Sequence, residues 1–136
     1  MVRHIVRDGF RTMKQTRDGS HIAAMFRDDG VLAFSGDHML GGERRGPAAV
    51  SAWFAQLFAT FPDLAIDPLA VIVAGPPWAT SVATRFSVTA TLPDGARYAN
   101  EGMQYLRLRF GRIVEDRLYE DTVKLVAALD IVRRRV

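Results

Sequence analysis

The clearest acid–base chemistry in this sequence lies in one short segment, residues 113–121, which reads IVEDRLYED. The segment alternates like a β-strand, yet five of its nine residues carry charge. Successive side chains of a strand point to opposite faces, so either register turns carboxyl groups toward the face that should be dry. A carboxyl group buried without a basic partner is destabilising, or it holds a proton. The question is which acids point inward, and what surrounds them.

The preceding segment, EGMQYLRLRF, indicates which face is inward. Its even positions are Gln104, Leu106, Leu108 and Phe110, whereas its odd positions include two arginines. If Phe110, Gly111 and Arg112 form a three-residue loop, even residues face even residues across the hairpin. We then expect Leu106 opposite Asp116 and Gln104 opposite Leu118. A two-residue turn would shift this alignment by one.

On this register Asp116 and Glu120 point inward, beside Gln104 and Asn100. No Lys or Arg on the even face of these strands is placed to pair with them. Asp116 and Gln104 are diagonal neighbours at roughly 7–8 Å, so one small ligand group can touch both. Glu120 is about 13 Å from Asp116 along the strand, too far to share a proton. We expect a pocket floor here; the alternative is a solvated Glu120 and an Asp116 that caps a backbone group.

Histidine offers a second acid–base group. His38, in the Gly-rich segment GDHMLGG, is a candidate general base beside Asp116, or it bonds only its own backbone. His4 and His21 are expected to be surface or packing residues. The three histidines lack the spacing of a metal motif and the chain has no cysteine, so we expect no metal site and no cofactor.

Composition limits the class of protein. The chain has 136 residues, 49% of them hydrophobic and 24% charged, which suits one soluble domain with its own core. No apolar run reaches the length of a membrane span, and the lack of cysteine favours a cytoplasmic location. The net charge of +3 is concentrated at the two ends rather than on a basic face with aromatic residues, so we expect no nucleic-acid or membrane partner.

Periodicity predicts the elements that must position these residues. A helix is expected over residues 2–16, although its arginines also fit a basic targeting helix; we favour the first helix of the domain. A short helix in DGSHIAAMFRDDG is expected to end at Gly30, followed by the strand VLAFS, the loop 36–46 and a helix over 47–61. The pattern then predicts strands at 65–74, 80–91, 97–110 and 112–120 and a helix at 122–130. This is one α+β domain, residues 1–130, with a basic tail at 131–136.

The chain resembles the NTF2-like superfamily, and within it the SnoaL-like relatives of polyketide cyclases and ketosteroid isomerases. The resemblance is carried by HIAAMFRDDGVLAF, LGGERRGPAAVSAWFAQLF, FPDLAI and NEGMQYLRLRFGRIVEDRLYED, and it covers nearly the whole chain. It implies a cone, in which a curved antiparallel sheet wraps round N-terminal helices and holds a pocket in its mouth. It implies less about activity, because this fold hosts isomerases, cyclases, dehydratases, epoxide hydrolases and binding modules.

The resemblance also allows the catalytic positions to be compared. The aspartate base and the first-helix tyrosine of ketosteroid isomerases correspond to Phe34 and Phe10, which can neither abstract nor donate a proton. Their protonated aspartate corresponds to Gln104, which keeps a donor. The acid/base aspartate of the SnoaL-like cyclases is similar to Asp116. The arginines of these strands fall on the outer face, which argues against the Asp-Arg-Asp site of epoxide hydrolases.

We therefore expect a cofactor-free enzyme of the isomerase or cyclase type, which acts on a small apolar carbonyl compound. Asp116 would be the acid/base, Gln104 an oxyanion donor and His38 a possible second base. The expected pocket residues are Phe10, Phe34, Trp53, Phe86, Asn100, Leu106, Leu118 and Glu120. The alternative is a non-catalytic ligand-binding or dimeric interaction module.

The odd positions of the strands predict an interaction surface. Arginine and tyrosine are enriched at protein interfaces, and no helix is expected to cover this face of the sheet. A homodimer through it is one interpretation, and a solvated sheet surface is the other. The residues expected in the interface are Arg85, Tyr105, Arg107, Arg117 and Tyr119.

Overall fold

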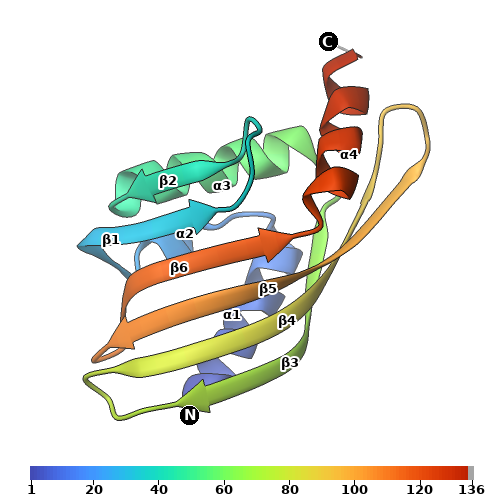
Figure 1. The fold of residues 1–136 in the computed structure, drawn as a ribbon. Coiled ribbons are helices and arrows are strands. Elements are labelled where there is room, and N and C mark those ends of the chain that lie inside the picture. Colours follow the sequence, from blue (N-terminus) through green and yellow to red (C-terminus); the bar gives the residue numbers. More distant parts are fainter. Residues whose placement is uncertain (135–136) are drawn as a thin grey trace.

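The computed structural model, which describes residues 1–134, is an α+β cone made of a curved, open six-stranded sheet and helices (Figure 1). The strands lie in the order β2-β1-β6-β5-β4-β3. The elements are α1 (Val2–Thr16), α2 (Ser20–Ala23), β1 (Phe26–Phe34), β2 (Gly42–Arg45), α3 (Pro47–Thr60), β3 (Ala65–Ala74), β4 (Thr80–Thr91), β5 (Arg97–Arg109), β6 (Arg112–Glu120) and α4 (Thr122–Arg134).

The predicted antiparallel meander is confirmed. β3, β4, β5 and β6 pair antiparallel in chain order, within a residue of the predicted bounds. β1 then pairs parallel with β6, and β2 pairs antiparallel with β1. The strand that carries Asp116 is thus flanked by β5 on one side and β1 on the other.

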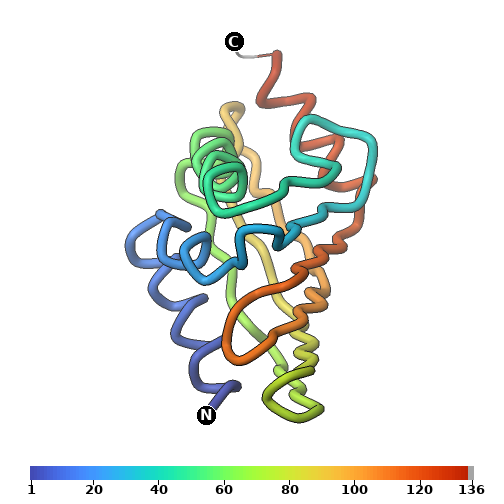
Figure 2. Tube along the Cα trace, turned by 90° about the vertical axis from the view of Figure 1, so that its left-hand side faces the viewer, coloured from blue at the N-terminus to red at the C-terminus, as the bar shows by residue number. Residues whose placement is uncertain are grey.

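The helices supply the other wall of the core. α1 packs against β3 and buries Phe10 and Met13, and α3 packs against β1 and β2. Pro47 lies in the first turn of α3, where its fixed φ and missing N–H cost least. Figure 2 shows both helices on the same side of the sheet, and α4 at the far end. None of the helices in the described range is both long and apolar enough to cross a bilayer.

Two expectations for residues 20–46 were wrong. The second helix ends at Ala23, and β1 already begins at Phe26. Gly30 lies within β1, where a Cβ atom would come within 2.7 Å of the Ile113 carbonyl oxygen; the glycine therefore permits a close approach of β1 to β6. The loop expected over residues 36–46 contains β2, a strand of four residues that pairs with β1.

The C-terminal helix is longer than the pattern predicted. α4 reaches Arg134 and so includes residues 131–134 of the expected tail, while residues 135–136 lie outside the described part. Its start is fixed by Asp121, whose Oδ1 accepts hydrogen bonds from the backbone N–H groups of Val123 and Lys124.

The β5–β6 hairpin differs from the expected loop but keeps the expected register. Phe110 and Gly111 form a two-residue turn with φ values of 48° and 78°, as in a type I′ turn. One extra residue then follows in β6, because Ile113 is paired with Leu108 but Asp116 with Leu106. This bulge cancels the shift that the shorter turn introduces, so Asp116 faces the core.

Candidate functional site

An apolar cavity of about 150 Å³ lies between the helices and the inner face of the sheet. Its exposed lining residues, Ile5 on α1 and Gly111 in the β5–β6 turn, mark its opening. From there the cavity runs inward past the floor strands β5 and β6. The predicted pocket residues that line it are Phe10, Phe34, Trp53, Phe86, Leu106, Leu118 and Glu120, together with Gln104 and Asp116.

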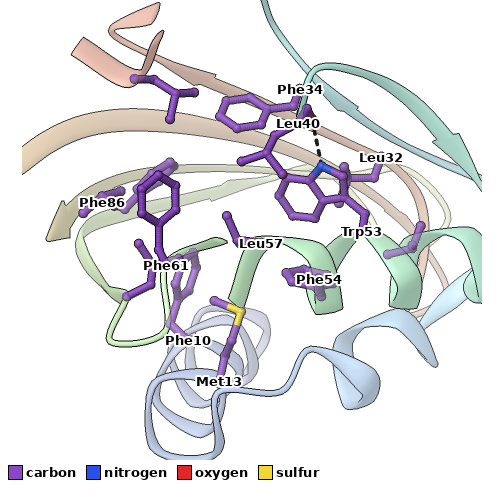
Figure 3. Close-up of a cluster of buried hydrophobic side chains, with 14 of the residues drawn as sticks. Phe10, Met13, Leu32, Phe34, Leu40, Trp53, Phe54, Leu57, Phe61 and Phe86 are labelled. Carbon is purple, nitrogen blue, oxygen red and sulfur yellow. Dashed lines mark hydrogen bonds between the residues drawn. The ribbon is translucent and has the colours of Figure 1, made fainter. Parts of the chain in front are cut away.

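Aromatic side chains form much of the wall (Figure 3). Trp53 on α3 packs edge-on against Phe34 on β1, with ring centroids 5.9 Å apart. Its indole Nε1 donates a 2.8 Å hydrogen bond to the carbonyl oxygen of Leu40, which fixes the ring between helix and sheet. Phe10 on α1 packs against Phe86 on β4 at 6.4 Å. These contacts join the helical layer to the floor.

Asp116 is the acid at the centre of this floor. Its side chain is 2% exposed, and Oδ1 accepts a 2.9 Å hydrogen bond from Nε2 of Gln104. Burial raises the pKa of Asp116 to about 7, and the bond from Gln104 opposes that rise only in part. At neutral pH the carboxyl group therefore exists in both its charged and its neutral form.

Two buried polar atoms, one of them on the residue that is bonded to Asp116, have no protein partner. Among the described residues these buried side-chain atoms are Gln104 Oε1 and Thr84 Oγ1. Thr84 on β4 is directly paired with Gln104 on β5, so the two side chains share one face of the sheet. Buried polar groups are nearly always bonded, so this spot is suited to holding an additional polar group.

A second polar group lies four residues along β6. Oε1 of Glu120 accepts hydrogen bonds from the Tyr98 hydroxyl at 3.1 Å and from Asn100 Nδ2 at 3.4 Å. Burial raises the pKa of Glu120 to about 7, against the opposing effect of the Tyr98 bond. Burial and the nearby Glu120 charge also raise the pKa of Tyr98. Tyr98 stacks on Phe61 at 5.6 Å, which fixes the donor.

His38 does not join Asp116. Its Nδ1 accepts from the Leu40 backbone N–H at 3.3 Å, and its Nε2 lies 3.1 Å from the Ser35 carbonyl oxygen. This pattern fits a neutral imidazole with the proton on Nε2. His38 is not among the residues that line the cavity, and its ring packs against Phe34. The geometry therefore fits the second interpretation of His38, in which this loop histidine bonds only its own backbone and is not a general base beside Asp116.

The remaining comparison with the sequence concerns three residues of the sheet. Asn100 lies behind the wall rather than in it, because its amide is bonded to Tyr98 and to the Asp121 carbonyl oxygen. Tyr98 and Thr84 were missed. Both occupy even positions of predicted strands, so the alternation that selected Gln104 and Leu106 could also have selected them.

The arrangement suits proton transfer. A buried carboxyl group that titrates near neutral pH can accept and return a proton in an apolar site. Within residues 1–134 no group of three or more His, Cys, Asp or Glu side chains is placed to hold a metal ion.

Comparison with known protein families agrees with the fold described above. The model of the SnoaL-like domain matches residues 6–116. The chain belongs to the SnoaL-like domain family. Through that family it belongs to the NTF2-like superfamily, as the sequence predicted, and the matched range contains Gln104 and ends at Asp116. A search among curated proteins found no match for this SnoaL-like chain.

Solved structures share the cone of this SnoaL-like protein. TerC, co-crystallised with polyporic acid, is 17% identical with a TM-score of 0.78, over 95% of this chain and 97% of TerC. Bal32a, from a soil-derived mobile gene cassette, is 17% identical with a TM-score of 0.77, over 91% of this chain and 92% of Bal32a. A candidate SnoaL-like polyketide cyclase from Jannaschia sp. CCS1 is 18% identical with a TM-score of 0.66, over 82% of this chain and 78% of the Jannaschia protein. At these identities the similarity shows the fold alone.

Proposed function

We propose that this SnoaL-like protein catalyses proton transfer on a small, mostly apolar carbonyl compound, without a cofactor, and that Asp116 is the acid/base. The observation that carries the proposal is the Asp116 carboxyl group, 2% exposed, on the floor of an apolar cavity and held by one side-chain hydrogen bond. Its pKa of about 7 suits both removal and return of a proton near neutral pH.

The size of the cavity limits the substrate. A volume of about 150 Å³ is similar to that of an engineered protein cavity that binds benzene, so the enclosed part of the ligand is about one ring in size. Apolar walls exclude water and so strengthen a hydrogen bond or charge formed beside Asp116. A proton taken by the carboxylate from the carbon next to the carbonyl would be returned to another atom of the same molecule, so the step needs no oxidant or reductant.

Gln104 has a positioning role in this proposal. Its Nε2 donates to Asp116 Oδ1, so this donor orients the acid instead of pointing at a substrate oxygen. The amide carries a second N–H, which is the one that an oxyanion-donor role requires. Holding Asp116 in one rotamer with a free second oxygen is the contribution that the described hydrogen bonds support.

Deuterium exchange tests the proposal without knowledge of the natural substrate. Purified protein is incubated with cyclohexanone in D₂O, and loss of the α-proton signal is followed by NMR. We expect exchange above the buffer rate with the native protein and with Asp37→Asn, an exposed control, but a loss of at least about 100-fold with Asp116→Asn. Exchange at the buffer rate, or full exchange with Asp116→Asn, would contradict the acid/base role.

A ligand-binding module without turnover is the second candidate. It is favoured by His38, because both of its ring nitrogens contact backbone groups and neither is available to Asp116. In that case cyclohexanone would bind, as seen by chemical-shift changes of Phe34 and Trp53, but its α-protons would not exchange.

We also propose that the outer face of the sheet forms a homodimer. Tyr105, Tyr119 and Met103 are 38%, 46% and 45% exposed on this face. The three arginines expected in this interface are already paired within the chain: Arg85 with Glu101 at 2.7 Å, and both Arg107 and Arg117 with Glu115 at 3.1 and 3.2 Å. Pairing within the chain lowers the like-charge repulsion that arises when two copies of this face meet.

A further inference from the structure

The charged side chains of the cavity all have the same sign. Of the described residues that line it, Asp116 and Glu120 are the ionisable acids, and none is Lys, Arg or His. A buried carboxylate needs a positive partner or a proton, because desolvation of an unpaired charge is costly. The described walls supply no cation, so each acid holds a proton unless a ligand brings a positive charge.

Glu120 is the better placed of the two acids to hold a charged group. Both of its donors, the Tyr98 hydroxyl and Asn100 Nδ2, bond to the same oxygen, Oε1. No described residue donates to Oε2. Asn100 is itself anchored by the Asp121 carbonyl oxygen at 3.0 Å, so the carboxyl group is held in place with one oxygen unused.

We propose that the Glu120 end of the cavity binds the positively charged nitrogen of a small apolar amine. The nitrogen would donate to Glu120 Oε2, and the apolar part would contact Phe61 and Leu125, which line the cavity on the helical side. Aromatic faces also attract cations, and Phe61 and Tyr98 supply two rings. The proposal rests on the cavity being a ligand site but does not need Asp116 to be catalytic, since that acid is about 13 Å away along β6.

The sign of the pH dependence separates this proposal from a neutral ligand. The titratable groups around Glu120 are Tyr98 on β5 and Asp121 at the start of α4; Phe61, Leu64 and Leu125 bring no charge from the other packed elements. A cation binds the charged carboxylate, so affinity should increase as the pH rises through the Glu120 pKa of about 7. A neutral carbonyl bound by the protonated acid would show the opposite trend.

The test uses two ring-sized probes, cyclohexylammonium and cyclohexanol, titrated by calorimetry into the full chain at pH 6 and pH 8.5. Cyclohexylammonium remains charged over this range. We expect its affinity to rise about tenfold between the two pH values and to exceed that of cyclohexanol by at least about tenfold at pH 8.5. Equal affinities, an affinity that falls with pH, or no binding of either probe at millimolar concentration would overturn the proposal.

Matched variants assign the effect to Glu120. Glu120→Gln should remove the preference for the ammonium probe and its pH dependence, whereas the exposed Glu43→Gln should keep both. Tyr98→Phe should keep binding but move the pH midpoint upward. In the native protein the Tyr98 hydroxyl bond lowers the pKa of Glu120, so its loss raises that pKa. Binding by Glu120→Gln at the native affinity contradicts the cation site. A failed exchange test with Asp116→Asn leaves it intact.

Discussion

Gln104 and Asp116 are neighbours on the inner face of adjacent strands, and a single 2.9 Å hydrogen bond joins them. The amide donates its nitrogen to the acid while its own oxygen, Oε1, has no partner in the described part of the chain. The pair is therefore asymmetric: Asp116 gains a fixed orientation, and Gln104 carries the cost of one unpaired acceptor.

Replacement of Gln104 tests this asymmetry. Gln104→Leu removes the donor that favours the charged carboxylate, so the pKa of Asp116 should rise further above 7. It also removes the unpaired Oε1, so the free energy of unfolding should change by less than about 1 kcal/mol. Carboxyl carbon shifts of Asp116, followed by NMR against pH, measure the first effect. An unchanged titration in Gln104→Leu would show that the bond has no electrostatic role; exposed Gln15→Leu is the control.

The stability of the protein should depend on pH through Asp116. Its pKa is about 7 in the folded state, above that of an unfolded aspartate, so the folded state binds more protons between about pH 4 and 7. The free energy of unfolding should therefore fall as the pH rises through this window. Asp116→Asn removes this contribution and should be more stable than the native protein at pH 8 by up to about 4 kcal/mol.

Urea unfolding at pH 5 and pH 8 measures this difference. Glu120 contributes a fall of the same sign, because its pKa is also raised, so Asp116→Asn should keep part of the pH dependence. Exposed Asp37→Asn should follow the native curve. A variant Asp116→Asn that is less stable than the native protein at pH 8 would mean that the carboxylate is compensated in the folded state.

Trp53 should contribute more to stability than its counterpart Trp78. Trp53 is 3% exposed and donates to the Leu40 carbonyl oxygen, whereas Trp78 is 62% exposed. Trp53→Phe leaves that carbonyl unpaired and enlarges the cavity, because the side chain in its wall becomes smaller. The free energy of unfolding should therefore fall by about 2–4 kcal/mol. Trp78→Phe should change it by less than about 0.5 kcal/mol. Equal effects of the two substitutions, measured by urea unfolding, would contradict the assigned role of the indole bond.

The proposed homodimer is tested by mass in solution. Light scattering should give twice the chain mass of 15.1 kDa for the native protein. Tyr119→Lys places a charge on the outer face and should give the monomer mass, while Val123→Lys, exposed on α4, should not. A native protein that is monomeric at all concentrations would exclude this interface.

Sequence alternation was enough to predict most of the fold that positions the site. The strands β4 and β5 have an even-numbered apolar face, and this face is the buried one from Val82 to Leu108. The same alternation identified Asp116 and Gln104 as inward, and the family resemblance agrees with the SnoaL-like domain match over residues 6–116. Side-chain period is a local property, so it can be recognised without the tertiary structure.

Features that depend on contacts between distant segments could not be predicted in this way. β2 has four residues and almost no apolar pattern, because it is an edge strand stabilised by its pairing with β1. Gly30 resembles a helix end, but its role is a close approach to Ile113. The hydrogen bonds that occupy His38 depend on the path of residues 35–40, which has no periodic pattern.

The extra residue in β6 has a consequence for how this chain can vary in length. Between Leu108 and Leu106 the chain advances two positions on β5, but between Ile113 and Asp116 it advances three on β6. Loss of one residue between Arg109 and Glu115 would exchange the two faces of β6, so that Glu115 and Arg117 would point inward and Asp116 toward solvent. Loss or gain of two would restore the original faces. Sequences that keep this acid in the cavity should therefore differ in length here by an even number of residues only. The constraint is on whether the number of residues is odd or even, and not on their type.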